Sequence, residues 1–197
     1  MAVKSSFKNM TLCLFAICLV CSGLLAGVYA LTAEPIAAAA AAKNEAAIME
    51  VLPSDAVKIE EERSVEIGGV TYTYNLAYDE PGNTVGCAIN VSALGFGGPI
   101  VIKVGVDVDG VICNTKVLSQ SETPGLGAKC TEPSFSDQFK GFNPSEKKLS
   151  VKKDGGDVDA ITASTITSRA YASALATAVK VFQTIGQTPM PLNEMEE

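Results

Sequence analysis

The chain has 197 residues, of which 47% are hydrophobic and 19% are charged, so general disorder is excluded and one ordinary domain plus an accessory segment is expected. Lys4 and Lys8 are the only charged residues before Glu34, so residues 34–197 hold 13 of the 15 basic side chains and all 22 acidic ones, a net charge of −9. This acidic balance argues against a nucleic-acid partner.

Histidine is absent from the sequence. Its absence excludes His-dependent catalytic triads and His metal sites, and it removes the commonest general base at neutral pH. The six cysteines fall into two groups of three, which are Cys13, Cys18 and Cys21 in an apolar segment and Cys87, Cys113 and Cys130 after it. The second group is odd in number and permits at most one disulfide, so the signal for an oxidising compartment is weak.

An apolar segment without Asp, Glu, Lys or Arg lies between Lys8 and Glu34, and it reaches the length of about 20 residues that a bilayer span requires. The positive-inside rule then predicts a cytoplasmic segment 1–10, a transmembrane helix 11–31 and an extracytoplasmic remainder. A secretory signal peptide is the alternative, because Val28-Tyr29-Ala30 is similar to a cleavage site. We favour a retained helix, since the apolar run exceeds the roughly 7 to 15 residues of a signal core.

Residues 32–52 contain Glu34-Pro35 followed by an alanine-rich stretch, a composition that predicts a helical connector with Pro35 near its first turn. A low-complexity linker is the alternative.

After this connector the sequence changes to short β-rich runs, each bounded by turn residues. The predicted strands are residues 57–65, 70–78, 84–93, 100–106 and 111–118. Hairpin-type turns are indicated at Gly68-Gly69, Pro81-Gly82-Asn83 and Asp109-Gly110, so neighbouring strands are expected to be antiparallel.

Helical patterns follow the β-rich region. Residues 135–142 predict a short helix, residues 149–151 another strand, and residues 164–185 a long helix. One apolar stripe of the long helix is formed by Tyr171, Leu175, Val179, Phe182 and Ile185. The predicted class is therefore α+β, with a twisted antiparallel sheet packed by helices in a domain of residues 53–197.

Three segments carry the chemical signals: residues 95–100, 121–129 and 162–168. Taken singly, the glycines indicate turns, and Thr162 or Ser164 indicates a helix N-cap. A hydroxyl at the first turn of a helix nevertheless faces unpaired backbone N–H groups and the positive dipole end, where a phosphate is most easily held. Thr165 is in this position and suggests a phosphate-bearing cofactor.

Together, in this order and behind a single apolar span, these segments closely resemble the G subunit of Rnf electron-transport complexes and its relative, the C subunit of sodium-pumping NADH:quinone reductase. Residues 135–141 add a further Rnf-like match, and the resemblance covers nearly the whole chain. It implies an FMN joined through its phosphate to the last Thr of an Asp-x-x-Ser/Thr-Gly-Ala-Thr motif, which is Thr165 here. The chain departs from the motif at Ala163, where the family has Gly, and at Ser164, where it has Ala.

The resemblance also implies a set of pocket residues. Glycine allows close backbone approach, Leu126 is expected to cover the ring, and Lys129 either offsets phosphate charge or is an exposed surface lysine. Thr167 and Ser168 are expected to supply hydroxyl contacts. The predicted cofactor-binding residues are Thr165, the covalent attachment point, with Glu122, Thr123, Leu126, Gly127, Lys129, Thr162, Ala163, Ser164, Thr167 and Ser168.

The implied function is that of an electron relay in a membrane-bound Rnf-type complex that couples electron transfer between ferredoxin and NAD to ion translocation. Its implied partners are the other membrane and peripheral subunits, an ApbE-type flavin transferase during maturation and the lipid bilayer of the inner (cell) membrane. No GxGxxG motif follows a strand and no cysteine set suits an iron–sulfur cluster, so NAD and ferredoxin are expected to dock on other subunits. The alternatives are a stand-alone membrane-anchored FMN-domain reductase and a non-redox anchored binding module.

Overall fold

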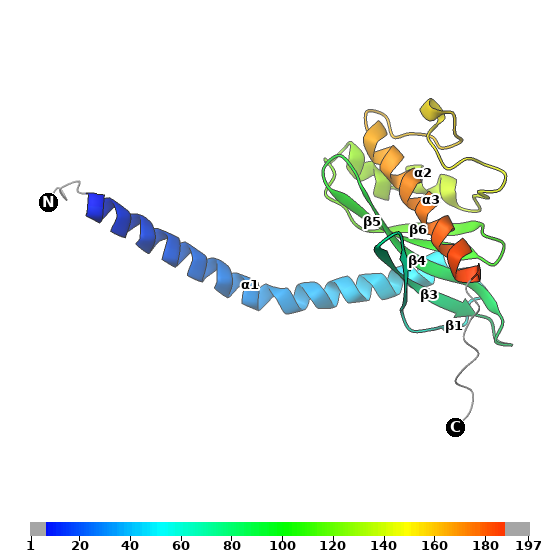
Figure 1. The fold of residues 1–197 in the computed structure, drawn as a ribbon, viewed down its shortest axis with the longest axis horizontal. Coiled ribbons are helices and arrows are strands. Elements are labelled where there is room, and N and C mark those ends of the chain that lie inside the picture. The colour runs from blue at the N-terminus through cyan, green and yellow to red at the C-terminus, as the bar shows by residue number, and fades with distance from the viewer. Residues whose placement is uncertain (1–6, 188–197) are drawn as a thin grey trace, which may run out of the picture. The chain divides into compact units, whose positions relative to one another are not determined.

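The computed structural model describes residues 7–187, which form parts of two compact units, residues 1–43 and 44–197 (Figure 1). The predicted cytoplasmic segment 1–10 therefore lies mostly outside the described residues, as does the end of the predicted domain after residue 187.

Helix α1 (Phe7–Val51) is continuous over 45 residues. An 18-residue window in it has a mean hydropathy of 2.4 and is not buried, so this helix is long and apolar enough to cross a membrane. The expectation that Pro35 starts a connector helix is wrong, because Pro35 lies inside α1. A proline in a helix interior removes one backbone hydrogen bond, and the alanine-rich sequence after Pro35 has a high helix propensity, which sustains the helix beyond it.

The second unit is built on one six-stranded antiparallel sheet in the order β1-β3-β4-β5-β6, with β2 also paired to β3 (Figure 1). The strands are β1 (Lys58–Ile59), β2 (Arg63–Ile67), β3 (Val70–Tyr78), β4 (Thr84–Leu94), β5 (Pro99–Asp107) and β6 (Ile112–Ser119). The expected antiparallel pairing of neighbouring strands is confirmed. The predicted strand 57–65 is two strands instead, because β1 and β2 pair with opposite ends of β3.

Helix α3 (Thr165–Gln187) packs across β4 and β5 on one face of the sheet (Figure 1). Its predicted apolar stripe is confirmed, since Tyr171 and Leu175 are fully buried and the remaining three residues are buried or packed against the core. Side chains alternate between the two faces of a strand, and β4 accordingly sends Cys87, Ile89 and Val91 into this core. This packing fixes where α3 begins relative to the strand ends.

The last residues of α1, which belong to the second unit, pack on the opposite face of the sheet. Ile48 and Val51 form a smaller apolar cluster there with Ala77 and Ala88. The approach is close at Gly105 in β5, where a Cβ would collide with the carbonyl oxygen of Val51. A glycine at this position therefore allows the helix end to lie directly on the sheet.

Short helical elements connect β6 to α3. They are the 3₁₀ helices η1 (Gly127–Thr131), η2 (Asp137–Phe139) and η3 (Lys152–Asp154), and the single-turn helix α2 (Pro133–Ser136). The helix predicted for residues 135–142 thus ends at Phe139, whose ring stacks on Tyr171 at a centroid distance of 5.1 Å. The strand predicted for residues 149–151 is wrong, because Val151 makes only a single bridge, to Val158. The chain then changes direction through η3 and Gly155, which has a left-handed backbone (φ 75°).

The face of the sheet that contacts α1 also buries Lys103 completely. The Lys103 ammonium donates to Asn75 Oδ1 at 3.4 Å, and Asn75 donates in turn to the backbone carbonyl of Glu60. Removal from water disfavours the charged amine and lowers the pKa of Lys103 from 10.5 to about 8.

Replacing Gly105 by Ala is expected to destabilise the domain by about 2 kcal/mol, because the added methyl group forces the Val51 backbone off the sheet. Gly186→Ala is the matched control, since Gly186 lies in α3 and a Cβ added there would meet no atom within 4 Å, and it should be neutral or stabilising. Urea unfolding measures both variants. Equal stability of the two would contradict the close packing of α1 on β5.

Replacing Lys103 by Met is expected to stabilise the domain by about 1 to 2 kcal/mol at pH 7, because the cost of burying a charge disappears. In the wild-type protein this cost is present in full below pH 8. It is relieved as the pH rises from about 8 to 10.5, since the folded state releases the Lys103 proton while the unfolded state keeps it. Unfolding free energies measured across this range should rise more steeply for the wild type than for Lys103→Met. Parallel pH profiles would contradict the buried amine.

Candidate functional site

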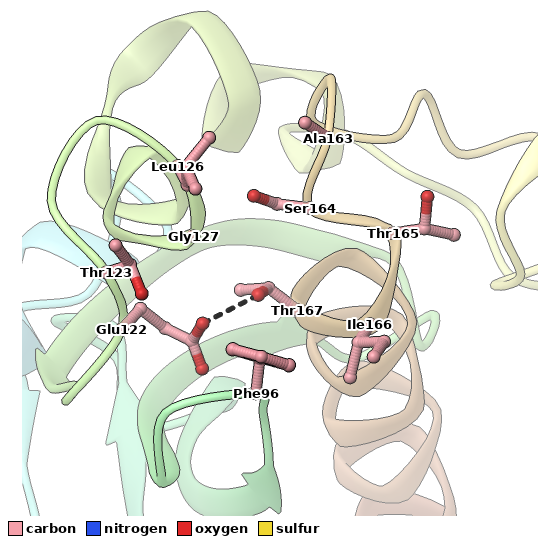
Figure 2. Close-up of a pocket in the computed structure, with 10 residues that line it drawn as sticks. All are labelled: Phe96, Glu122, Thr123, Leu126, Gly127, Ala163, Ser164, Thr165, Ile166 and Thr167. Carbon is pink, nitrogen blue, oxygen red and sulfur yellow. Dashed lines mark hydrogen bonds between the residues drawn. The ribbon is translucent and has the colours of Figure 1, made fainter.

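A cavity of about 370 Å³ opens where three segments meet: the loop after β4, the segment after β6 and the first turn of α3 (Figure 2). Its volume lies in the range of small-molecule sites, which is about 300 to 1,000 Å³. The lining residues are Phe96, Glu122, Thr123, Leu126, Gly127, Ala163, Ser164, Thr165, Ile166 and Thr167.

Glu122 is buried at the floor of this cavity and is only 6% exposed. The backbone N–H of Gly97 donates to its Oε1 at 3.1 Å, and the Thr167 hydroxyl donates to its Oε2 at 2.8 Å (dashed line in Figure 2). Each carboxylate oxygen therefore has a hydrogen-bond donor, as a buried acceptor requires.

Glycines make room for this carboxylate on two sides. A Cβ at Gly95 would collide with Glu122 Oε1, and a Cβ at Gly127 would collide with Oε2. Glycine at position 127 was predicted to allow close approach to a cofactor. In the structure the Glu122 side chain occupies the space that a Cβ at position 127 would need.

Two side chains hold the loop that leads into α3. Gln138 accepts from the Asp159 N–H at 2.8 Å and donates to the Asp159 carbonyl at 3.2 Å. At the other end of the loop, the Ser168 hydroxyl accepts from the Ile161 N–H at 2.9 Å and donates to the Ser164 carbonyl at 3.0 Å. The loop is therefore anchored before and after the residues that line the cavity.

Thr165 is the first residue of α3 and is partly exposed at the cavity. The predicted start of the helix, Ser164, is confirmed to within one residue. The first N–H groups of a helix have no partner within the helix, and the dipole there favours negative charge. The cavity wall at Thr165 thus offers a hydroxyl and the environment of a helix N-terminus.

Ala163 has a left-handed backbone with φ 61°, and among the described residues it is the one non-glycine residue with positive φ. This conformation is readily adopted by glycine and costs other residues about 1 to 2 kcal/mol. The Gly that the related motif has at this position therefore has a structural reason, and the alanine here is held against its preference.

Cys130 is buried behind the cavity on η1. Burial, with a smaller contribution from the nearby Glu122 carboxylate, raises the pKa of the Cys130 thiol to about 11. Because the thiolate is the nucleophile and metal ligand, a thiol kept protonated at neutral pH is inert packing.

The structure brings eight of the eleven predicted residues to the cavity lining and leaves Lys129, Thr162 and Ser168 outside it. Lys129 and Thr162 are not buried, whereas Ser168 is fully buried and bonded to the loop backbone. Two lining residues, Phe96 and Ile166, were not predicted. The sequence could have indicated Phe96, because it is an aromatic residue inside a glycine-rich loop. It could have indicated Ile166, because it is an apolar residue next to Thr165.

Comparison with known families defines the class of protein. Residues 95–180 match the model of the FMN-binding domain, and residues 1–51 match the model of the RnfG N-terminal region. The FMN-binding match spans all three cavity segments. This is a flavoprotein with an FMN-binding domain behind an N-terminal apolar helix.

Proteins that align with most of this chain identify its family. The G subunit of the ion-translocating oxidoreductase complex of Methanosarcina acetivorans is 35% identical over 81% of this chain and 86% of its own length. The G subunit of the proton-translocating ferredoxin:NAD(+) oxidoreductase complex of Clostridium ljungdahlii is 31% identical over 88% of both chains. The corresponding protein of Yersinia pestis is 34% identical over 90% of both chains.

Among solved structures, the C subunit of the Na(+)-translocating NADH-quinone reductase of Parabacteroides distasonis matches with 27% identity and a TM-score of 0.47 over 60% of this chain and 64% of its own.

The chain belongs to the family of G subunits of Rnf-type ion-translocating oxidoreductase complexes. It is the FMN-carrying electron-transfer subunit of a multi-subunit membrane complex, and its apolar helix is a single-pass membrane anchor.

Replacing Ala163 by Gly is expected to stabilise the domain by about 0.5 to 1 kcal/mol, because relief of the left-handed strain exceeds the added entropy of the unfolded chain. Ala160→Gly is the matched control, since Ala160 is exposed in the same loop and has negative φ, and it should destabilise slightly. Urea unfolding compares the two. A loss of stability in both variants would contradict the strained conformation.

Proposed function

We propose that Thr165 carries FMN as a phosphoester and that the ring lies in the cavity of Figure 2. Supporting the attachment, Thr165 ends the motif, begins α3, is partly exposed and lines the cavity. The observation that carries the proposal is this coincidence of an accessible hydroxyl, a helix N-terminus and a cavity of suitable size.

The cavity lining fits both ends of such a cofactor. Phe96, Leu126 and Ile166 are 71%, 43% and 51% exposed and supply apolar surface for a flat ring. Ser164 and Thr165 stand at the helix start, where a phosphodiester gains from backbone N–H donors and the helix dipole. We assign Thr123 and Gly127 to the wall of the pocket, on the side that Leu126 covers.

We propose that the attachment is made by an ApbE-type flavin transferase. The step forms a bond between the Thr165 hydroxyl oxygen and the phosphorus of an activated flavin phosphate and breaks the bond from that phosphorus to its leaving group, which departs with the hydroxyl proton. Thr165 suits this step, because it is partly exposed and the neighbouring Ala163 and Ser164 have small side chains that admit a modifying enzyme.

The tether has a physical rationale on a membrane-anchored relay. A phosphoester leaves the redox-active ring unaltered and prevents its loss to the aqueous phase. The bound flavin supplies the electron chemistry, and this chain supplies its position and its surroundings.

In the complex, we propose that this protein relays electrons between ferredoxin and NAD, which dock on other subunits. The relative in Clostridium ljungdahlii is named for a proton-translocating ferredoxin:NAD(+) oxidoreductase, and that in Acetobacterium woodii, 35% identical over 54% of this chain and 53% of its own length, for a Na(+)-translocating one. Because these names differ in the ion, we propose ion translocation without assigning the ion.

We propose further that α1 spans the inner (cell) membrane with its N-terminus in the cytoplasm and the FMN-binding domain outside. The support is the charge distribution, since Lys4 and Lys8 precede the apolar segment and no Lys or Arg follows it before Lys43.

Replacing Thr165 by Ala is expected to abolish covalent flavin while lowering stability by no more than about 2 kcal/mol, because only a hydroxyl at a helix start is lost. Flavin fluorescence on a denaturing gel and intact mass measure attachment after co-expression with the transferase.

Thr177→Ala is the matched control for this experiment, since Thr177 is a threonine of the same helix outside the cavity lining and should keep full flavin loading. Thr165→Ser tests whether a hydroxyl suffices and should retain flavin. Covalent flavin that persists in Thr165→Ala would overturn the assignment.

A further inference from the structure

Glu122 joins three segments that are distant in the sequence. Its own segment follows β6, Gly97 lies between β4 and β5, and Thr167 lies in the first turn of α3. The two hydrogen bonds described for its carboxylate both come from neutral donors, a backbone amide and a hydroxyl. The backbone of Glu122 is held as well, because its N–H donates to Gln120 Oε1 at 2.6 Å.

These contacts act on two of the segments that line the cavity. The loop of Gly97 is a tight turn closed by the Gly95 N–H, which donates to the Gly98 carbonyl at 2.9 Å, and it presents Phe96 at the cavity (Figure 2). In the second segment, Thr167 is 1% exposed and lies two residues after Thr165. The carboxylate therefore ties the Phe96 loop to the helical turn that bears Thr165.

The fit around the carboxylate leaves little freedom. Gly95 and Gly127 approach it so closely that a Cβ at either position would collide with it, and Gly97 itself packs against the backbone of Ser121. A group enclosed in this way sets the spacing of its neighbours, because interiors are close-packed and do not deform continuously.

We propose that Glu122 is a positioning residue whose carboxylate fixes the separation between the Phe96 loop and the first turn of α3, and thereby the orientation of the flavin ring. This inference rests on the proposed attachment at Thr165. The carboxylate acts through Gly97 and Thr167, which donate to its two oxygens.

The variant Glu122→Gln distinguishes an effect of hydrogen-bond geometry from an effect of the negative charge. In Glu122→Gln the amide oxygen still accepts from the Gly97 N–H, and the amide nitrogen donates to the Thr167 hydroxyl, which accepts as well as donates. This variant keeps both ties and removes the negative charge. Glu122→Ala loses both ties, and Thr167→Val loses one while preserving the shape of the side chain.

The test has one readout without flavin and one with it. In the flavin-free protein, amide exchange at Gly97 should rise about tenfold in Glu122→Ala, because a hydrogen bond to a carboxylate is lost, and change less than about threefold in Glu122→Gln. In the flavin-loaded protein, the visible circular dichroism of the ring should fall at least about twofold in Glu122→Ala and Thr167→Val and stay near the wild-type value in Glu122→Gln.

Thr115→Val is the matched control for Thr167→Val. Thr115 is also a buried threonine, and its hydroxyl lies 2.8 Å from the Tyr171 hydroxyl, outside the cavity. The control loses a comparable hydrogen bond and should leave the flavin signal unchanged. If Glu122→Ala does not fold, the pair Thr167→Val and Thr167→Ser carries the test, because serine restores the hydroxyl and should restore the signal.

Flavin loading on Thr165 is measured by mass before the spectra are compared. A wild-type protein without flavin on Thr165 would contradict the proposed function and would also overturn the inference about ring orientation. Loaded Glu122→Ala or Thr167→Val with the wild-type spectrum would overturn the inference and leave the attachment intact. A loss in Glu122→Gln equal to that in Glu122→Ala would also overturn it, since the charge and not the spacing would then matter.

Discussion

The candidate site depends on one buried carboxylate. A carboxylate removed from water is costly unless donors replace its hydration, and Glu122 meets this requirement with the Gly97 N–H and the Thr167 hydroxyl. The same requirement explains the glycines at positions 95 and 127, since any side chain there would occupy the space of the carboxylate. Three segments far apart in the sequence are thereby brought to one cavity.

The fold supplies the frame on which this contact operates. Tyr171 joins α3 to both the sheet and the connecting helices, because its hydroxyl lies 2.8 Å from that of Thr115 and its ring stacks on Phe139. With α3 held in this way, its first residue, Thr165, stands at the cavity rather than in the core. The other face of the sheet takes the end of α1, so this helix end and α3 use opposite faces.

Much of this arrangement could be predicted from the sequence, because strand alternation, hairpin turns and the stripe of α3 are local patterns. The role of Glu122 could not, since it depends on contacts across 25 and 45 residues. The burial of Lys103 was missed for the same reason, as a lysine in an alternating strand indicates an exposed face, whereas in the fold it is fully buried beside Asn75. Pro35 was misplaced because proline favours a first helical turn, whereas the surrounding helix continued through it.

We propose that this protein holds its flavin covalently on the hydroxyl at the start of α3. It is tested most directly by tandem mass spectrometry of peptides from the protein purified from its native membrane. One FMN mass increment is expected, with fragment ions that place it on Thr165. An unmodified peptide containing Thr165, or a flavin on another residue, would contradict it.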